Sequence, residues 1–107
     1  MANKLLQGTV DVLILKTLSQ GPMHGYGVSA WIRRRTEGEL GLEDAALYQA
    51  LHRLQHKKWI EAEWGVSENN RRAKYYQLTD PGRRELHREE SMWRSYAAAV
   101  FKILETA

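Results

Sequence analysis

Cysteine is absent from the 107 residues of this chain. A chain without thiols forms no disulfides, no cysteine-based zinc site and no thiolate nucleophile. The absence also suits a reducing compartment, so we expect the protein to act in the cytoplasm. Hydrophobic residues make up 43% of the chain, which is enough for a packed core, and the length fits one domain better than two separate cores.

The sequence also lacks the short motifs that accompany common enzyme chemistries. GxSxG, GxGxxG and GxxxxGK[ST] are all absent, and no spaced pair of carboxylates points to a catalytic cleft. His52 and His56 have the i, i+4 spacing of a zinc-binding helix, but Arg53 stands where the catalytic glutamate would be. We therefore expect no enzyme activity, no cofactor and no metal.

No long apolar run is present either. The hydrophobic start of the chain, residues 1–16, is interrupted by Gln7, Asp11 and Lys16, and no small-residue cleavage site follows it. We interpret it as an amphipathic helix over residues 5–19, not as a signal peptide or a membrane span. Because this helix is apolar most of the way round, it needs cover on two sides, from its own core and from a partner chain.

Two further helices and a hairpin are predicted from the spacing of apolar residues. The helices extend over residues 24–36 and 44–57. After Lys58 the period changes to two, which predicts a strand over 60–66 and a return strand over 72–78. On the first strand we expect one buried face, formed by Ile60, Ala62, Trp64 and Val66.

Thr79 is predicted to cap a last helix of about 25 residues, roughly 37 Å long at 1.5 Å per residue. A single helix of that length has no core to rest on, so it is a candidate for coiled-coil-like pairing. Its inner heptad positions are Leu86, Glu89, Trp93, Tyr96, Val100 and Ile103.

The resulting order is three helices, a β-hairpin and a long helix. This is the winged helix-turn-helix plan, in which the third helix enters the major groove of DNA and the hairpin, or wing, follows the backbone or minor groove. The fold class is therefore mainly α with a small antiparallel hairpin. We expect a DNA-binding domain over residues 1–79 and a dimerisation helix over 80–107.

Three segments resemble the PadR family of bacterial transcriptional regulators. They are GPMHGYGV (21–28), ALYQALHRLQHKKWIEAEW (46–64) and RRAKYYQLTDPGRREL (71–86). The resemblance implies a homodimeric winged-helix repressor whose C-terminal helix packs against the first and last helices of its partner. The single-helix tail is similar to that of the short-tailed group. Three positions depart from the family pattern: Gln49 stands for a common proline, Gln55 for a glutamate and Lys58 for a glycine. The last predicts a differently shaped turn.

The third helix and the wing supply most of the expected contacts with DNA. Glutamine can bond adenine and arginine can bond guanine through paired hydrogen bonds, while basic residues at the wing tip neutralise phosphates. A mild net charge of +3 is weak support without such placement. The candidate DNA-binding residues are His24, Tyr26, Ala45, Tyr48, Gln49, His52, Arg53, Asn69, Asn70, Arg71, Arg72 and Lys74.

Two of these residues have a second interpretation. Tyr26 either meets DNA or packs into the core, and Arg53 either meets DNA or pairs with a nearby acid. The basic run Arg33, Arg34 and Arg35 is interpreted as a solvated end of the second helix, where positive charge is favourable.

A homodimer is expected to bury apolar residues of the first and last helices. Trp93 is either an aromatic residue of that interface or part of an effector pocket formed with Tyr96, with Glu89 as a polar lip. The candidate interface residues are Leu5, Val12, Leu15, Leu86, Trp93, Tyr96, Val100 and Ile103.

These observations predict a sequence-specific repressor that binds a pseudo-palindromic operator as a dimer and leaves it when a small hydrophobic or aromatic effector binds. The alternative is a winged-helix module for protein–protein interaction, which would need no basic wing. Neither interpretation involves a membrane.

Overall fold

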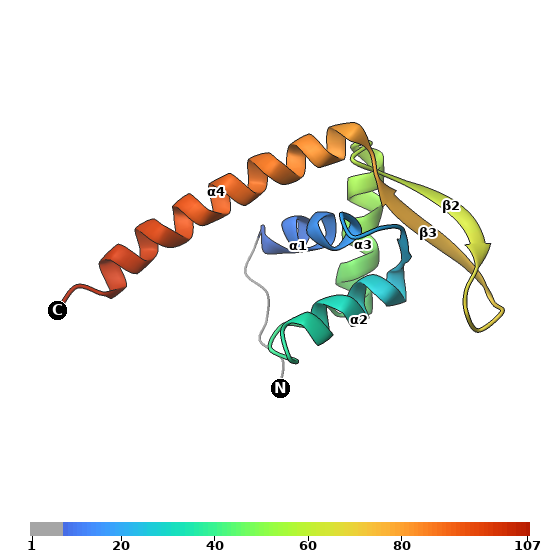
Figure 1. The fold of residues 1–107 in the computed structure, drawn as a ribbon, viewed down its shortest axis with the longest axis horizontal. Helices are drawn as coiled ribbons and strands as arrows, with labels where there is room; N and C mark the ends of the chain where they lie inside the picture. The colour runs from blue at the N-terminus through green and yellow to red at the C-terminus, as the bar shows by residue number, and fades with distance from the viewer. Residues whose placement is uncertain (1–7) are drawn as a thin grey trace.

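The computed structural model describes residues 8–107, and Figure 1 shows how its helices surround one end of a small sheet. The predicted order of elements is confirmed, with one short strand added. Leu5, a predicted interface residue, lies outside the described residues. The elements are α1 (Thr9–Leu18), β1 (Met23–His24), α2 (Gly25–Arg35), α3 (Asp44–His56), β2 (Ile60–Val66), β3 (Arg72–Leu78) and α4 (Asp80–Leu104).

The core lies where the three N-terminal helices meet the base of the sheet and the start of α4. Leu47, Leu51 and Leu54 of α3 are all buried there, as their helical spacing predicts. Ile60 from β2 and Leu86 from α4 close the same cluster. The core thus joins residues from α1, α2, α3, the sheet and the start of α4, which together form the body of the molecule, and it fixes the direction of α3.

The added strand β1 makes the sheet three-stranded and antiparallel, in the order β1-β3-β2. Met23 pairs with Tyr76 and His24 pairs with Tyr75. Two residues carry no readable period, so a strand this short exists only through its tertiary pairing with β3. Its consequence is that the start of α2 is held against the wing.

The wing extends beyond the core, and this overturns part of the predicted buried face of β2. Ile60 is buried and Ala62 is half-buried, but Trp64 is 57% exposed and Val66 is 65% exposed. The alternating pattern continues to the tip of the hairpin, whereas the hairpin diverges from α3 and leaves an open groove between them (Figure 1). The same face is therefore core at one end and surface at the other.

Turn geometry at both ends of the hairpin is tightly defined. Thr79 Oγ1 accepts a hydrogen bond from the Gly82 N–H at 3.0 Å and donates one to the Lys58 carbonyl at 2.7 Å. The predicted cap of α4 is thus confirmed. Lys58 itself has φ 65°, so the turn keeps the left-handed geometry that a glycine would suit, contrary to the expected change of shape. At the wing tip, Asn70 has φ 58°.

Helix α4 begins on the body and then runs away from it (Figure 1). Its 25 residues match the predicted length. Leu86 is buried, but Ile103 is 75% exposed and Leu104 is 70% exposed. Over the described residues, no helix is both long and apolar enough to cross a membrane.

Three of the predicted interface residues are not exposed at the surface of the single chain. Val12, Leu15 and Leu86 are buried within the single chain, with Leu15 fully covered. The reason is that α1 lies between α3 and the start of α4, so both of its apolar sides are covered by its own chain. Little of the apolar surface of α1 therefore remains for a partner.

Candidate nucleic-acid interface

The outer face of α3 is free of core contacts along its length. Ala45, Tyr48, Gln49 and His52 are all exposed, while the leucines between them are buried. The helix therefore presents one continuous polar stripe to solvent, as its amphipathic spacing predicts. Asp44 begins the helix, and Glu43 occupies the cap position without a side-chain hydrogen bond.

Arg53 lies on the same helix but is already engaged. Its guanidinium forms an ion pair with the Asp11 carboxylate of α1. This contact is the second of the two interpretations given for Arg53, and it draws the side chain toward the body. Arg53 is thus a weaker candidate for DNA than its neighbours on α3.

The start of α2 has a defined geometry around His24. The His24 Nδ1 atom accepts a hydrogen bond from the Gly27 N–H at 3.0 Å and so caps the helix. The imidazole ring also meets the Tyr75 ring edge-on, with centroids 5.4 Å apart. Tyr26, by contrast, is 78% exposed, so its packing into the core is excluded.

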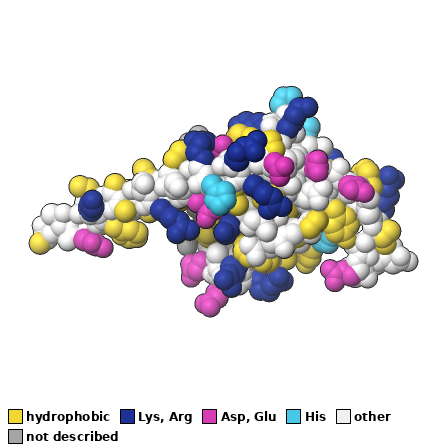
Figure 2. All heavy atoms as spheres, turned by 45° about the horizontal axis from the view of Figure 1, so that its top comes forward, with side chains coloured by type: hydrophobic (Ala, Val, Ile, Leu, Met, Phe, Trp, Pro, Cys, Tyr) yellow, Lys and Arg dark blue, Asp and Glu magenta, His cyan; other side chains and the backbone are white. Residues whose placement is uncertain are grey.

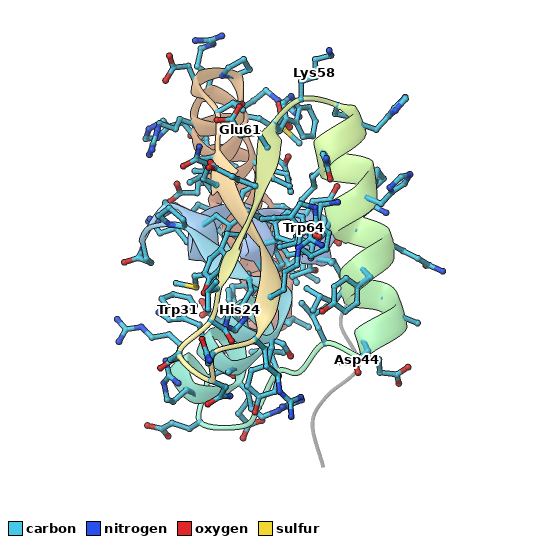
Figure 3. The ribbon with its side chains drawn as sticks, turned by 90° about the vertical axis from the view of Figure 1, so that its right-hand side faces the viewer. His24, Trp31, Asp44, Lys58, Glu61 and Trp64 are labelled. Atoms are coloured by element: carbon cyan, nitrogen blue, oxygen red, sulfur yellow. The ribbon has the colours of Figure 1, made fainter. Side chains whose placement is uncertain are left out.

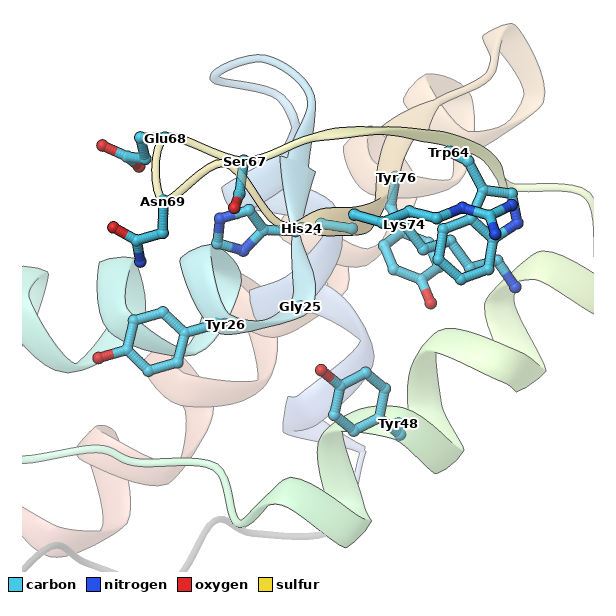
Figure 4. Close-up of a pocket in the computed structure, with 12 residues that line it drawn as sticks. His24, Gly25, Tyr26, Tyr48, Trp64, Ser67, Glu68, Asn69, Lys74 and Tyr76 are labelled. Atoms are coloured by element: carbon cyan, nitrogen blue, oxygen red, sulfur yellow. The ribbon is translucent and has the colours of Figure 1, made fainter.

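Gly25 explains how α2 and α3 approach each other. A side chain built on Gly25 would place its Cβ 2.8 Å from the Tyr48 hydroxyl oxygen, closer than a side-chain carbon normally comes to a non-bonded oxygen. The Tyr48 ring therefore rests against the first residue of α2, where only glycine leaves room. In Figure 4 the Tyr48 hydroxyl points toward Gly25. This contact fixes the most prominent aromatic side chain of the α3 face.

The wing tip is held by a compact turn. The Ser67 N–H donates to the Arg71 carbonyl at 2.7 Å, and the Arg71 N–H donates to Ser67 Oγ at 3.3 Å. Asn69, Asn70, Arg71 and Arg72 are all exposed around this turn. The tip thus presents amide and guanidinium donors to solvent, together with the acidic side chain of Glu68.

A groove of about 780 Å³ joins these three elements (Figure 4). Its walls come from the start of α2, the first turns of α3 and both strands of the wing. Two cations, Arg72 and Lys74, line it beside several aromatic rings. The lining residues are His24, Gly25, Tyr26, Tyr48, Trp64, Ser67, Glu68, Asn69, Arg72, Ala73, Lys74 and Tyr76.

A second hollow of about 470 Å³ lies farther along α3. It is lined by His52, Gln55, His56, Lys58 and Lys74, with no carboxylate among them. Lys74 lines both hollows, so the two lie next to each other between α3 and the wing. Figure 3 shows this arrangement, with Trp64 between the strands and α3.

The candidate effector residues lie where α4 leaves the body. Trp93 packs partly against the core and meets Tyr96 edge-on at a centroid distance of 6.0 Å. Burial raises the pKa of Glu89 to about 7, assisted by a hydrogen bond to Glu85 and by the negative charges of Glu85 and Asp11. The Arg88 guanidinium, bonded to Glu85, lowers the pKa of that second carboxyl. Glu89 is therefore the carboxyl at this junction whose charge changes near neutral pH.

An exposed third helix beside a basic β-hairpin is the arrangement of a winged-helix DNA-binding protein. The sequence comparison identifies the family to which this winged-helix protein belongs. The chain belongs to the transcriptional regulator PadR-like family, whose model matches residues 14–88. It is therefore a DNA-binding transcription regulator and not an enzyme.

Relatives of known structure cover the chain almost completely. A transcriptional regulator from Clostridium thermocellum is 28% identical, with a TM-score of 0.84 over 92% of this chain and 96% of that chain. A PadR-like transcriptional regulator from Bacillus cereus is 26% identical, with a TM-score of 0.82 over 98% of this chain and 100% of that chain. An uncharacterised protein from Lysinibacillus sphaericus is 30% identical over 101 residues, covering 94% of this chain and 93% of its own length.

Sequence reasoning missed two residues of this surface. Gly25 is not among the predicted residues, although the structure places Tyr48 directly against it. Trp64 was assigned to the core because it shares the parity of Ile60. The signal for Trp64 was the alternation of Arg72 and Lys74 across the hairpin, which places two cations on its face of the sheet.

Proposed function

We propose that this regulator is a sequence-specific repressor that binds a pseudo-palindromic operator as a homodimer. The observation that carries the proposal is the convergence of the α2 start, the outer face of α3 and the basic wing on one groove. A repressor of chromosomal genes acts in the cytoplasm. Residues 1–79 would form its DNA-binding part and 80–107 its dimerisation helix.

The spacing of α3 and the wing suggests how DNA is seated. The major and minor grooves of B-DNA are separated by a sugar-phosphate strand. If α3 enters the major groove and the wing the adjacent minor groove, that strand passes between them. The cationic lining of this space, from Arg72, Lys74 and Lys58, supports such an occupant.

Base recognition falls to the exposed first turns of α3. Gln49 carries an amide that can bond adenine N6 and N7 together, and Tyr48 is held beside it by its contact with Gly25. The wing arginines contact phosphates or the minor groove and fix the register without reading much sequence. Recognition and positioning are thus separate tasks of separate elements.

The outer half of α4 supports a dimer. Its exposed apolar side chains have no cover within the described chain, and they extend along the helix as yellow patches in Figure 2. Pairing with a second copy would bury them and would set two α3 helices on successive major grooves. The exposed apolar residues are Met92, Tyr96, Val100, Phe101, Ile103 and Leu104.

Release by an effector is the regulatory part of the proposal. Trp93 and Tyr96 present aromatic surface at the point where α4 leaves the body, next to the half-buried Glu89. A small aromatic or hydrophobic compound bound there in the dimer would favour one relative arrangement of the two wings. If that arrangement does not match the operator, binding shifts the population away from DNA.

Selection from a randomised duplex pool tests sequence-specific binding. The wild-type protein should enrich an inverted repeat with half-sites about one helical turn apart. Gln49→Ala should enrich a different base at one position of each half-site while retaining the spacing. If no sequence is enriched above the starting pool, the alternative of a protein–protein interaction module on the same fold is favoured instead.

A further inference from the structure

Trp64 is the exposed aromatic residue of the wing that the proposed function has not yet used. It lies in the middle of β2 and directly opposite Lys74 of β3. More than half of its surface is open to solvent, although tryptophan is usually well covered in folded proteins. The indole also lines the groove that faces α3. Its position is therefore neither core nor unrelated to the DNA-facing surface.

The indole has one close polar neighbour on the same face of the sheet. The Arg72 guanidinium carbon lies 4.4 Å from the centroid of the Trp64 ring. Arg72 stands two residues before Lys74 on β3, so it is the diagonal neighbour of Trp64. A guanidinium at this distance over tryptophan is attracted electrostatically and stacks through its planar surface. The same arrangement recurs closer to the core, where Lys74 Nζ lies 5.8 Å from the Tyr76 ring centroid.

What holds Arg72 determines what it can bind. In residues 8–107, the ion pairs of arginine involve Arg53, Arg88 and Arg94, and none involves Arg72. A carboxylate partner would occupy the N–H donors and cancel the charge. A ring partner takes up only one face of the guanidinium, so its in-plane donors stay directed outward.

We propose that Trp64 is a positioning residue for DNA binding, which stacks on Arg72 and holds its guanidinium ready to contact a phosphate of the DNA backbone. The inference rests on the proposed function. A long flexible side chain loses rotamer freedom when it is fixed at an interface, which weakens binding. Trp64 removes part of that cost before DNA arrives. Arg71, the neighbour at the tip, has no such ring against it among the described contacts.

Four variants test the inference on a duplex that the wild-type protein has selected from a randomised pool. Trp64→Leu keeps apolar bulk but lacks a ring, and should weaken binding about fivefold. Trp64→Phe restores a ring and should bind within about twofold of the wild type. Arg72→Gln should weaken binding in the wild-type background. In the Trp64→Leu background, the same change should add little, because the two residues act together.

The melting temperatures of all four variants should match that of the wild type, since both positions are exposed. The inference is overturned if Trp64→Leu binds as the wild type does. It is also overturned if the effects of Trp64→Leu and Arg72→Gln multiply, because Trp64 would then touch DNA on its own account. Absence of duplex binding by the wild type would instead refute the proposed function.

Discussion

The body and the distal part of α4 differ in how they cover their apolar side chains. The body comprises α1 to α3, the sheet and α4 as far as Leu86, and most of its large aliphatic residues are buried within one chain, Val66 near the wing tip being an exception. Distal α4, residues 92–104, leaves Ile103 and Leu104 mostly exposed although both belong to a regular helix. Solvent-exposed apolar rows of this kind mark sites that bind another protein, a membrane or a ligand. A complete core and an incomplete one thus occur in the same molecule.

The difference separates stability from assembly. Changes in the body should affect whether the chain folds and how it meets DNA, whereas changes in distal α4 should affect only whether two chains associate. A change in the body, a change in distal α4 and a change at the junction between them should therefore have different effects.

The largest effect is expected where α4 crosses the body. Gly82 lies so close to the Trp59 carbonyl oxygen that an added Cβ would overlap that backbone atom. Gly82→Ala should therefore lower the free energy of unfolding by about 3 kcal/mol, because neither backbone segment yields easily. Chemical denaturation measures this loss. Arg83→Ala, on the exposed side of the same turn, is the control, and equal stability of both variants would contradict the described packing.

A smaller and more selective effect is expected on distal α4. Val100→Asp would place a charge within the proposed interface between copies, where burial without a partner is unfavourable. The dimer should dissociate about a hundredfold more readily, or about 2.7 kcal/mol, with little change in helix content or in the melting temperature of the body. Sedimentation analysis reports the association. Ser95→Asp, on the exposed polar side of the helix, should leave it unchanged.

Unchanged association of Val100→Asp would show that the apolar row has another occupant. The body and distal α4 would still differ in how much of their apolar surface is exposed. The assignment of distal α4 to dimerisation would have to be abandoned.

The smallest effect is expected at the junction and depends on pH. The pKa of Glu89 in the folded chain is about 7, above its ordinary value of 4.5, because burial favours the neutral acid. A raised pKa contributes stability that is complete below pH 4.5 and is lost as the pH rises through 7. The melting temperature should therefore fall between pH 5 and pH 8, and Glu89→Gln should reduce that fall.

Glu90→Gln provides the matched control for this prediction. Glu90 is the next residue along α4, and its carboxylate lies 3.7 Å from Lys16 Nζ and 3.3 Å from Arg94 Nη2. Its substitution should leave the fall between pH 5 and pH 8 in place. If Glu89→Gln retains the full dependence on pH, Glu89 is not the group whose titration changes the stability.

Much of the fold could be predicted because it depends on local periodicity. The leucines of α3 and the cap at Thr79 followed from spacing and residue type alone. Trp64 and Val66 were misplaced because an alternating pattern shows which residues share a face of the strand. It does not show where along the strand the core ends. The two-residue strand β1 left no pattern, since it forms only through pairing with β3.

The candidate site was predictable in outline and not in its contacts. The chain order placed α3 and the wing together, but the pairing of Arg53 with Asp11 joins residues that are 42 positions apart. Val12 and Leu15 were assigned to an interface because α1 is apolar on two sides. The structure covers both sides with other elements of the same chain. Contacts between distant segments are the part that one sequence does not display.

The central claim is that the body carries one basic face for DNA, and a salt titration of duplex binding tests it most directly. The logarithm of the association constant should fall linearly with the logarithm of salt concentration, by about 0.9 for each phosphate contact. Arg71→Ala with Arg72→Ala should bind more weakly and give a shallower slope, whereas Arg34→Ala with Arg35→Ala, at the end of α2, should match the wild type. Weak, salt-insensitive binding by the wild type, or an unchanged slope in the wing variant, would contradict the account.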